Sequence, residues 1–231
     1  MCEANQTPEQ RFSNVIRRIR DACASHKRDP DHIRLLAVSK TKPAEQIQAL
    51  ARLGQRSFGE NYVDEAVEKI ELLRDLKLCW HFIGPIQSNK TRLLAEHFDW
   101  IESVDRVKIA RRLADQRPEV KPPLKVLIQV NLDGESQKAG CAAEEIDELA
   151  EFIDARPELQ LRGLMAIPAQ RDDSEAQRAV FSRLKTHFDA LARSHPSVDT
   201  LSAGMSGDME AAIAAGSTEI RVGTDLFGPR S

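Results

Sequence analysis

The sequence predicts an α/β fold in which eight parallel strands, each but the last followed by a helix, close into a (β/α)8 barrel of the TIM type. Three observations support this prediction. Short runs rich in branched apolar residues alternate with segments of helical periodicity along the 231 residues. Eight such units suit a closed barrel. The main alternative, an open doubly wound sheet, is disfavoured because no GxGxxG motif follows the first strand.

An extra helix is expected before the first strand. Thr7 is a suitable N-cap, Pro8 fits the first helical position and Gln10 completes a capping box, so this helix is predicted over about 8–25. Strands are predicted at 33–39, 56–61, 79–84, 100–104, 124–131, 161–167, 200–205 and 219–223. Helices are predicted after the first seven strands, at 43–53, up to about 73, up to about 96, and at 107–116, 143–155, 173–193 and 208–215. No shift in composition marks a linker, so residues 1–231 are expected to form a single domain.

Composition narrows the class of protein. Hydrophobic residues make up 41% and charged residues 30% of the chain, as in globular rather than disordered proteins. The 33 Lys and Arg against 36 Asp and Glu give a net charge of -3, which argues against a nucleic-acid-binding protein. The apolar runs are too short to span a membrane, and the polar N-terminus lacks a secretory signal. The scattered cysteines, Cys2, Cys23, Cys79 and Cys141, are expected to be reduced thiols of a cytoplasmic protein.

Lys40 is the most informative residue at the C-terminal ends of the predicted strands, where barrels of this kind carry their chemistry. Strand alternation puts Lys40 on the same face as Leu36 and Val38. If that face points inward, the amine stands at an apolar mouth, where desolvation lowers its pKa and favours a Schiff base with a carbonyl compound. The alternative is a lysine that extends from the strand end into water.

A second pattern indicates a phosphate site. The segment 204–208 (GMSGD) leads from the seventh strand into a short helix, so Ser206 and Gly207 would present backbone amides to an anion. Gly223 and Thr224 at the end of the eighth strand supply further amides and a hydroxyl. Barrels often bind phosphate with the loops after these two strands. The alternative is that the glycines only make turns and Ser206 only caps the helix.

Arg221 and Met165 complete the candidate site. Arg221 shares a strand face with Glu219 and Gly223, so it either pairs with an acid such as Glu219 or contacts the ligand. Met165, at the end of the sixth strand, either fills the core or packs on a flat ring. His81 is interpreted as a hydrogen-bonded core histidine, and no histidine pair has the helical spacing of a metal site. A lysine at the first strand, a phosphate cup at the last two and a flat-ring contact together describe a site for pyridoxal 5'-phosphate (PLP).

Six motifs lie in a fixed order along the chain. They are residues 37–43 (AVSKTKP), 58–63 (FGENYV), 80–90 (WHFIGPIQSNK), 163–168 (GLMAIP), 201–209 (LSAGMSGDM) and 220–228 (IRVGTDLFG). In this order and spacing, the chain resembles the pyridoxal phosphate homeostasis protein family over about residues 11–230.

The resemblance implies a barrel similar to the N-terminal domain of alanine racemase. It implies that Lys40 is the Schiff-base lysine. It also implies a phosphate cup made by Ser206, Gly207, Gly223 and Thr224. By the same resemblance, Arg221 matches an arginine near the cofactor, and Asn61 and Met165 match positions around its ring.

The resemblance further implies a carrier rather than an enzyme. Racemases of this fold pair a lysine base with a tyrosine from a C-terminal domain, and we expect no such domain after the eighth strand of this sequence. The one tyrosine, Tyr62, lies beside the second strand. A permanent charge on Arg221 facing the pyridine nitrogen would also weaken the cofactor as an electron sink. We therefore expect a cytoplasmic, monomeric protein that holds PLP on Lys40 and supplies it to apo-enzymes.

Two alternatives stay open on the sequence alone. One is a PLP-dependent amino-acid racemase that uses another second base. The other is a Schiff-base aldolase or phosphosugar-binding barrel without PLP. Both share the fold, so the fold does not choose between them. A separate hypothesis is that Lys138, in the polar loop 133–140, takes PLP from Lys40 during transfer.

Overall fold

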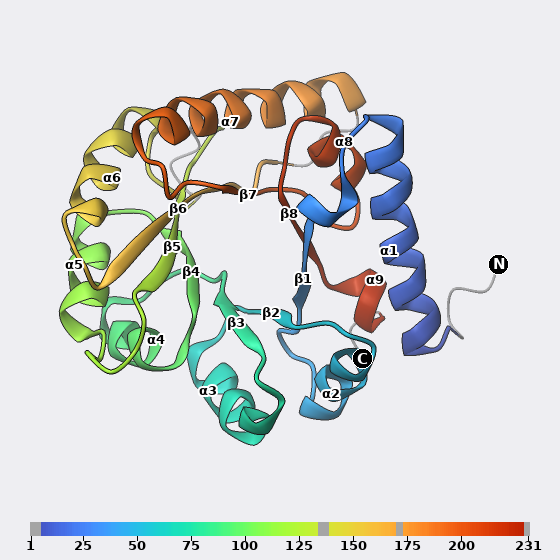
Figure 1. Ribbon diagram of the computed structural model, residues 1–231, viewed down its shortest axis with the longest axis horizontal. Helices are drawn as coiled ribbons and strands as arrows, with labels where there is room; N and C mark the ends of the chain where they lie inside the picture. Colours follow the sequence, from blue (N-terminus) through green and yellow to red (C-terminus); the bar gives the residue numbers. More distant parts are fainter. Residues whose placement is uncertain (1–5, 134–138, 170–172, 229–231) are drawn as a thin grey trace.

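The computed structural model describes residues 6–133, 139–169 and 173–228. Within these residues, eight parallel strands are hydrogen-bonded in chain order, and β8 pairs with β1 (Figure 1). They are β1 (Arg34–Val38), β2 (Ser57–Glu60), β3 (Cys79–Phe82), β4 (Trp100–Val104), β5 (Leu124–Gln129), β6 (Leu159–Met165), β7 (Thr200–Ser202) and β8 (Glu219–Val222). The pairing of the last strand with the first closes the barrel and confirms the predicted fold class.

Helices follow the strands and cover the outside of the barrel, as the alternation predicts (Figure 1). The main ones are α1 (Pro8–Ser25), α2 (Ala44–Arg52), α3 (Val63–Leu72), α4 (Thr91–His97), α5 (Val107–Gln116), α6 (Ile146–Asp154), α7 (Ser174–Ser194) and α8 (Met209–Ala214). A further short helix, α9 (Thr224–Phe227), follows β8 and was not predicted. Its four residues are too few to show a helical period in the sequence.

Four strands differ from the prediction by two or more residues at an end: β3, β5 and β7 end at Phe82, Gln129 and Ser202 rather than at 84, 131 and 205, and β6 was expected at 161–167. The observed strand begins two residues earlier because Leu159 pairs with Leu124 at the start of β5. It also ends two residues earlier, at Met165, which is the last β6 residue paired with β5. Met165 is therefore the C-terminal residue of its strand and stands beside Ser202 of β7.

The extra N-terminal helix α1 forms over the predicted range. Thr7 accepts a hydrogen bond from the Gln10 amide, and the Gln10 side chain accepts one from the Thr7 amide, which confirms the capping box. Val15 and Ile19 bury one face of the helix. Helix α1 lies beside α8 and α9 (Figure 1), so it is next to the segments that follow β7 and β8.

The strands separate an apolar outer core from a polar interior. Side chains that face the helices, such as Phe58, Ile101 and Ile220, belong to one large hydrophobic cluster. Alternation along the strands turns the intervening side chains into the barrel. Buried polar groups from these strands include His81, Glu102, Ser202, Glu219 and Arg221. The barrel interior is therefore a charged network, which needs internal partners to be stable.

The described residues also bear on two expectations from composition. None of their helices combines the length and the apolar character that crossing a membrane requires. Cys23, Cys79 and Cys141 are free thiols. The fourth cysteine, Cys2, lies outside the described residues.

Candidate ligand site at the mouth of the barrel

The predicted site residues follow strands that all point the same way, so their strand ends share one rim of the closed barrel. Lys40 comes two residues after β1, which lies between β8 and β2. Val38 pairs with Gly59 of β2. On the other side, a Cβ placed on Gly223 would stand 3.4 Å from the Val38 carbonyl oxygen. The ends of β8, β1 and β2 thus bring Gly223, Lys40 and Asn61 to adjoining parts of the mouth.

Lys40 lies in a turn and is half-buried. Its strand has Leu36 buried on the face that strand alternation assigns to the barrel interior. The residues on either side of Lys40 are tightly held, since Ser39 is fully buried and Thr41 adopts a left-handed backbone with φ of 63°. The structure therefore places Lys40 at the mouth, as predicted, on a segment of restricted conformation.

Asn61 carries a polar atom for which the described residues supply no partner. Its side-chain oxygen Oδ1 is buried and receives no hydrogen bond from them. The backbone of Asn61 packs so closely on Gly84 that a Cβ there would stand 2.3 Å from the Asn61 carbonyl oxygen. The Ser103 hydroxyl donates to the Gly84 carbonyl over 2.6 Å and holds this contact in place. Asn61 also lines a cavity of about 340 Å³, but the other lining residues, such as Tyr62 and Lys90, are not among the predicted site residues. A buried acceptor without a partner calls for an explanation, and a bound ligand is one.

The loop after β7 is built as a tight turn. Gly204 has a φ of 99°, and a Cβ on it would meet Ala212 at 2.6 Å, so only glycine fits there. The Asp208 carboxylate accepts a hydrogen bond from the Met205 amide over 2.6 Å and closes the turn. Between these anchors, Ser206 is half-buried and Gly207 is exposed. The predicted phosphate-binding loop is therefore shaped by residues other than those that would contact the anion.

Arg18 on α1 joins the two predicted phosphate loops. Its Nη2 donates to the Ser206 carbonyl over 2.8 Å, and its Nη1 donates to Asp225 over 2.6 Å. Asp225 directly follows Thr224 in the loop after β8. Arg18 also pairs with Glu210 of α8. Sequence analysis missed this arginine because its partners lie 188 and 207 residues away.

Arg221 lies below this mouth and is buried within the barrel. Its Nη1 donates to the Ser202 hydroxyl over 2.7 Å, and its Nη2 donates to the Ala166 carbonyl over 2.8 Å. One of the two predicted alternatives, a direct ion pair between Arg221 and Glu219, does not form. Glu219 pairs with Arg34 instead, at 3.1 Å. Both direct acceptors of Arg221 are neutral, so its charge is balanced only through further residues.

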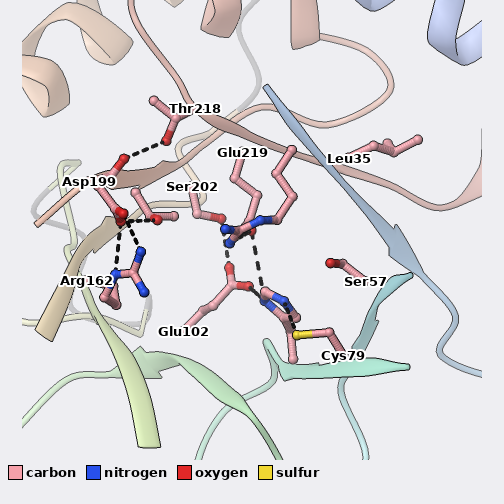
Figure 2. A network of polar contacts seen from close by, with 12 residues as sticks. Leu35, Ser57, Cys79, Glu102, Arg162, Asp199, Ser202, Thr218 and Glu219 are labelled. Carbon is pink, nitrogen blue, oxygen red and sulfur yellow. Dashed lines mark hydrogen bonds and ion pairs between the residues drawn. The ribbon is translucent and has the colours of Figure 1, made fainter. Parts of the chain in front are cut away.

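A chain of hydrogen bonds runs from Arg221 into the interior through Glu102, which Figure 2 shows between Ser202 and Cys79. Ser202 donates to Glu102 Oε2 over 2.7 Å. Glu102 Oε1 lies 2.6 Å from Nδ1 of His81, and the other ring nitrogen of His81 lies 3.5 Å from Cys79 Sγ. The interpretation of His81 as a hydrogen-bonded core histidine is confirmed.

Burial sets the protonation of this network. It raises the pKa of the Cys79 thiol to about 12 and lowers the pKa of His81 to about 4, so the thiol is protonated and the imidazole neutral near neutral pH. A neutral His81 that accepts from Cys79 donates from Nδ1 to Glu102. Burial, assisted by the charge of Glu102, raises the pKa of Glu219 to about 7. Glu102 therefore accepts hydrogen bonds from two side chains, Ser202 and His81. Ser202 in turn accepts from Arg221.

Met165 and Trp100 fill the remaining interior. Met165 is fully buried and clusters with Trp100 and Leu127. The ring of Trp100 stacks on His81 at 5.1 Å and lies under the guanidinium of Arg34 at 4.6 Å. Met165 thus packs inside the barrel at the end of β6. Contact between Met165 and the ring of a ligand stays a prediction.

His81, Glu102 and Glu219 place one ligand atom each within 4.8 Å of one another, a spacing that a metal ion also requires. Here the guanidinium of Arg34 pairs with Glu219, and that of Arg221 reaches Glu102 through Ser202. These contacts hold the two acidic side chains from within the barrel, although Oε1 of Glu219 has no hydrogen-bond partner among the described residues. Lys138, named above as a transfer residue, lies outside the described residues.

Comparison with known proteins adds the family. The family model described as "Alanine racemase, N-terminal domain" matches residues 10–231. The pyridoxal phosphate homeostasis protein of Pseudomonas aeruginosa is 53% identical over 224 residues, which cover 97% of this chain and 96% of that protein. The protein of the same name from Escherichia coli K12 is 53% identical over 222 residues, which cover 95% of each.

Solved structures agree with this placement. PipY of Synechococcus elongatus, solved without and with PLP, is 39% identical and covers 91% of this chain and 100% of its own, with TM-scores of 0.81 and 0.77. Alanine racemase from E. faecalis is 18% identical, with a TM-score of 0.70 over 94% of this chain and 58% of its own, and it shares the fold alone. On the family model and on relatives more than half identical over nearly their whole length, the chain belongs to the pyridoxal phosphate homeostasis protein family, which has the N-terminal barrel of alanine racemase.

Proposed function

We propose that this chain binds PLP covalently through Lys40 and holds it for delivery to apo-enzymes, as a homeostasis protein rather than an enzyme. The observation that carries the proposal is that Lys40, Asn61 and the loops after β7 and β8 converge on one mouth, with Arg221 directly below it. The solved PLP complex of PipY, a relative at 39% identity, supports the choice of ligand.

The residues at the mouth fit the parts of this cofactor. The amides of Ser206, Gly207, Gly223 and Thr224 suit its phosphate, because consecutive backbone N–H groups in turns form anion sites. The buried oxygen of Asn61, which has no partner among the residues that the structure describes, would accept from a donor on the ligand. We assign Arg221 to the ring nitrogen and Met165 to the apolar packing of the ring.

Lys40 supplies the covalent link. When bound, PLP provides an electrophilic aldehyde. The unprotonated Nζ of Lys40 attacks the aldehyde carbon, a C=N bond replaces the C=O bond, and the oxygen leaves as water. Water or another amine reverses the linkage, so the same lysine both retains the cofactor and releases it.

We infer a carrier because the charges around Arg221 favour holding over turnover. Arg221 binds two neutral oxygens and keeps its positive charge. A cation facing the pyridine nitrogen opposes protonation of the ring, which weakens the electron sink that racemisation needs. Tyr62, the one tyrosine of the sequence, is 56% exposed at the start of α3. An exposed phenol lacks the fixed environment of a second catalytic base.

We further infer that residues 1–231 act as one cytoplasmic unit and as a monomer. The closed barrel supports this state because it leaves no open sheet edge among the described strands. The partners that the proposal requires are PLP itself and the apo forms of PLP-dependent enzymes. Light scattering that gives the mass of one chain, with and without PLP, would agree with a monomer, and a dimer mass would contradict it.

Delivery is the test of the carrier role. PLP-loaded protein, freed of unbound PLP, is mixed with an apo-enzyme that needs PLP, and the return of that enzyme's activity is followed. We expect activity to return as the visible band of the loaded protein falls. The matched control is Lys185→Ala, on the outer helix α7, which should behave as wild type. A loaded protein that never restores activity would contradict the carrier role.

The two alternatives give different results. A racemase would invert single amino-acid enantiomers at a rate that disappears in Lys40→Ala. An aldolase or phosphosugar-binding barrel would be trapped by borohydride with a sugar phosphate in protein free of PLP. Either result would replace the carrier assignment, whereas the carrier predicts neither.

A further inference from the structure

Lys69 on α3 is a buried lysine that the proposed site does not use. Its side chain is only 8% exposed, which is rare for a lysine unless its charge is paired. Its Nζ donates to the Ser39 carbonyl over 2.8 Å, to Glu60 over 2.8 Å and to Glu65 over 2.5 Å. All three ammonium donors are therefore used, and they join the end of β1, the end of β2 and α3.

The same cluster holds both neighbours of Lys40. The Ser39 hydroxyl donates to Glu60 Oε1 over 2.6 Å, the oxygen that also accepts from Lys69. The Thr41 amide donates to Glu65 Oε1 over 2.7 Å, again an oxygen that Lys69 shares. Two carboxylates and one ammonium thus tether the chain immediately before and immediately after Lys40.

The tether at Thr41 holds a conformation that the chain would not adopt by itself. The φ of 63° at this residue lies in the left-handed region, which is unfavourable for a β-branched side chain. Such a conformation persists where surrounding contacts over-determine it, often at functional sites. The bond from the Thr41 amide to Glu65 is one of those contacts. Loss of the cluster would let the turn at 39–42 relax.

Stability alone is a weak reason for this arrangement. Burying charged groups costs desolvation energy that the pairing only roughly offsets, and apolar residues of similar size often stabilise as much or more. Glu60 is fully buried. The cluster makes directional hydrogen bonds to the backbone on both sides of Lys40, which an apolar core could not make.

We propose that Lys69, acting through Glu60 and Glu65, is a positioning residue for the amine of Lys40. The inference rests on the proposed function, since it concerns the lysine that forms the covalent link. Lys40 has a long, flexible side chain, so fixing its backbone limits the positions that its amine can reach. A misplacement of about 1 Å at a reacting atom can cost about a hundredfold in rate.

The test separates the covalent step from pocket binding. Dissociation constants are measured for PLP and for pyridoxine 5'-phosphate, which has the same ring and phosphate but no aldehyde. The rate at which the visible band forms with PLP is measured beside them. In Lys69→Met, we expect PLP affinity and band formation to fall by about tenfold or more. Affinity for pyridoxine 5'-phosphate should change less than about twofold.

Two further variants keep the test valid if the single variant does not fold. Lys69→Met/Glu60→Gln removes the two most deeply buried charges together, so the carboxylate that is left, Glu65, is the partly exposed one, and the variant should show the same selective loss. Glu65→Ala removes the acceptor of the Thr41 amide, whereas Glu65→Gln keeps an acceptor oxygen there. We expect Glu65→Gln to recover most of the rate that Glu65→Ala loses, which a general loss of stability would not produce.

The matched control is Lys185→Met, because Lys185 also pairs with an acid four residues away, at 2.6 Å, but on α7. It should bind both ligands as wild type does. Folded Lys69 variants that form the band at the wild-type rate would overturn the inference, as would equal losses for both ligands. If wild-type protein itself forms no band with PLP, the proposed function fails first and the inference with it.

Discussion

Ser202 shows how a single small residue controls the charge of the interior. Its hydroxyl accepts from Arg221 over 2.7 Å and donates to Glu102 over 2.7 Å. It is fully buried, so no water replaces either bond without rearrangement. The hydroxyl is the link that couples the guanidinium to the carboxylate. The position of Arg221 in the proposed site therefore depends on Ser202, which lies inside the barrel.

Ser202→Ala should therefore cost more than an ordinary serine substitution. It leaves a guanidinium donor and a carboxylate oxygen buried without this partner, and each such loss costs about 1–3 kcal/mol. We expect the free energy of unfolding in urea to fall by at least about 2 kcal/mol. Ser25→Ala, at the exposed end of α1, is the control and should change it by less than about 0.5 kcal/mol. A Ser202→Ala protein as stable as the control would refute this account of the network.

Individual site residues differ in how far the sequence reveals them. Strand alternation grouped Lys40 with Leu36 and grouped Arg221 with Glu219, because the two-residue period survives small errors in the strand ends, but it did not say which face turns inward. The partners of Arg221 were not predictable, since Ser202 and Glu102 are 100 residues apart and meet only when the barrel closes. The contacts of Lys69 were not predictable either, since its acceptor at Ser39 lies 30 residues away.

Helix α1 precedes the first strand of the barrel, and it contacts the segments that follow β7 and β8 at the mouth. Through Arg18 it contacts the loop after β7, α8 and the loop after β8. These contacts bring together two loops that no strand pairing connects at that point. The helix therefore has a positioning role for the proposed phosphate cup, in addition to the burial of Val15 and Ile19.

Arg18→Met should loosen the phosphate cup without affecting the amine of Lys40. We expect affinity for pyridoxine 5'-phosphate, which binds without the covalent link to Lys40, to fall by about tenfold, or about 1.4 kcal/mol. Arg17→Met is the neighbouring control, because within the described residues the Arg17 guanidinium donates to Asn14 of its own helix and not to the loops of the cup. Equal affinities in the two variants would show that α1 does not support the cup.

The elements themselves were largely predictable. β4 and α5 have the predicted boundaries because their branched or amphipathic patterns end at clear polar residues. The short helix α9 was not predicted, because its N-cap Gly223 and four residues carry no periodic signal. The loops after β7 and β8 could be named from their glycines, but their connection through Arg18 depends on how α1 packs.

The whole molecule has a charged barrel interior whose protonation is linked to folding. Burial raises the pKa of Glu219 to about 7, so its neutral form stabilises the fold at low pH and that contribution is lost as the pH rises through about 7. Burial lowers the pKa of His81 to about 4, so its neutral form stabilises the fold above pH 6.5 and that contribution is lost as the pH falls toward 4. The two contributions therefore change in opposite directions as the pH falls below about 7.

From pH 6 to pH 8 the contribution of Glu219 to stability should fall by on the order of 1 kcal/mol, while the contribution of His81 should rise by somewhat less, so wild-type stability should fall only slightly. Glu219→Gln removes the group that opposes His81, so the stability of this variant should rise from pH 6 to pH 8. Urea unfolding at both pH values measures the free energies for each protein. A Glu219→Gln variant whose stability changes with pH as that of wild type does would contradict the raised pKa of Glu219 in the folded state.

We propose that Lys40 at the mouth holds PLP covalently, and chemical reduction followed by mass spectrometry locates the bond between lysine and cofactor. Protein incubated with PLP is reduced with borohydride, digested and analysed by mass spectrometry, so that the modified residue is read from the peptide. The account predicts a single major pyridoxyl modification on Lys40. A major modification on another lysine, or none after PLP loading, would contradict it.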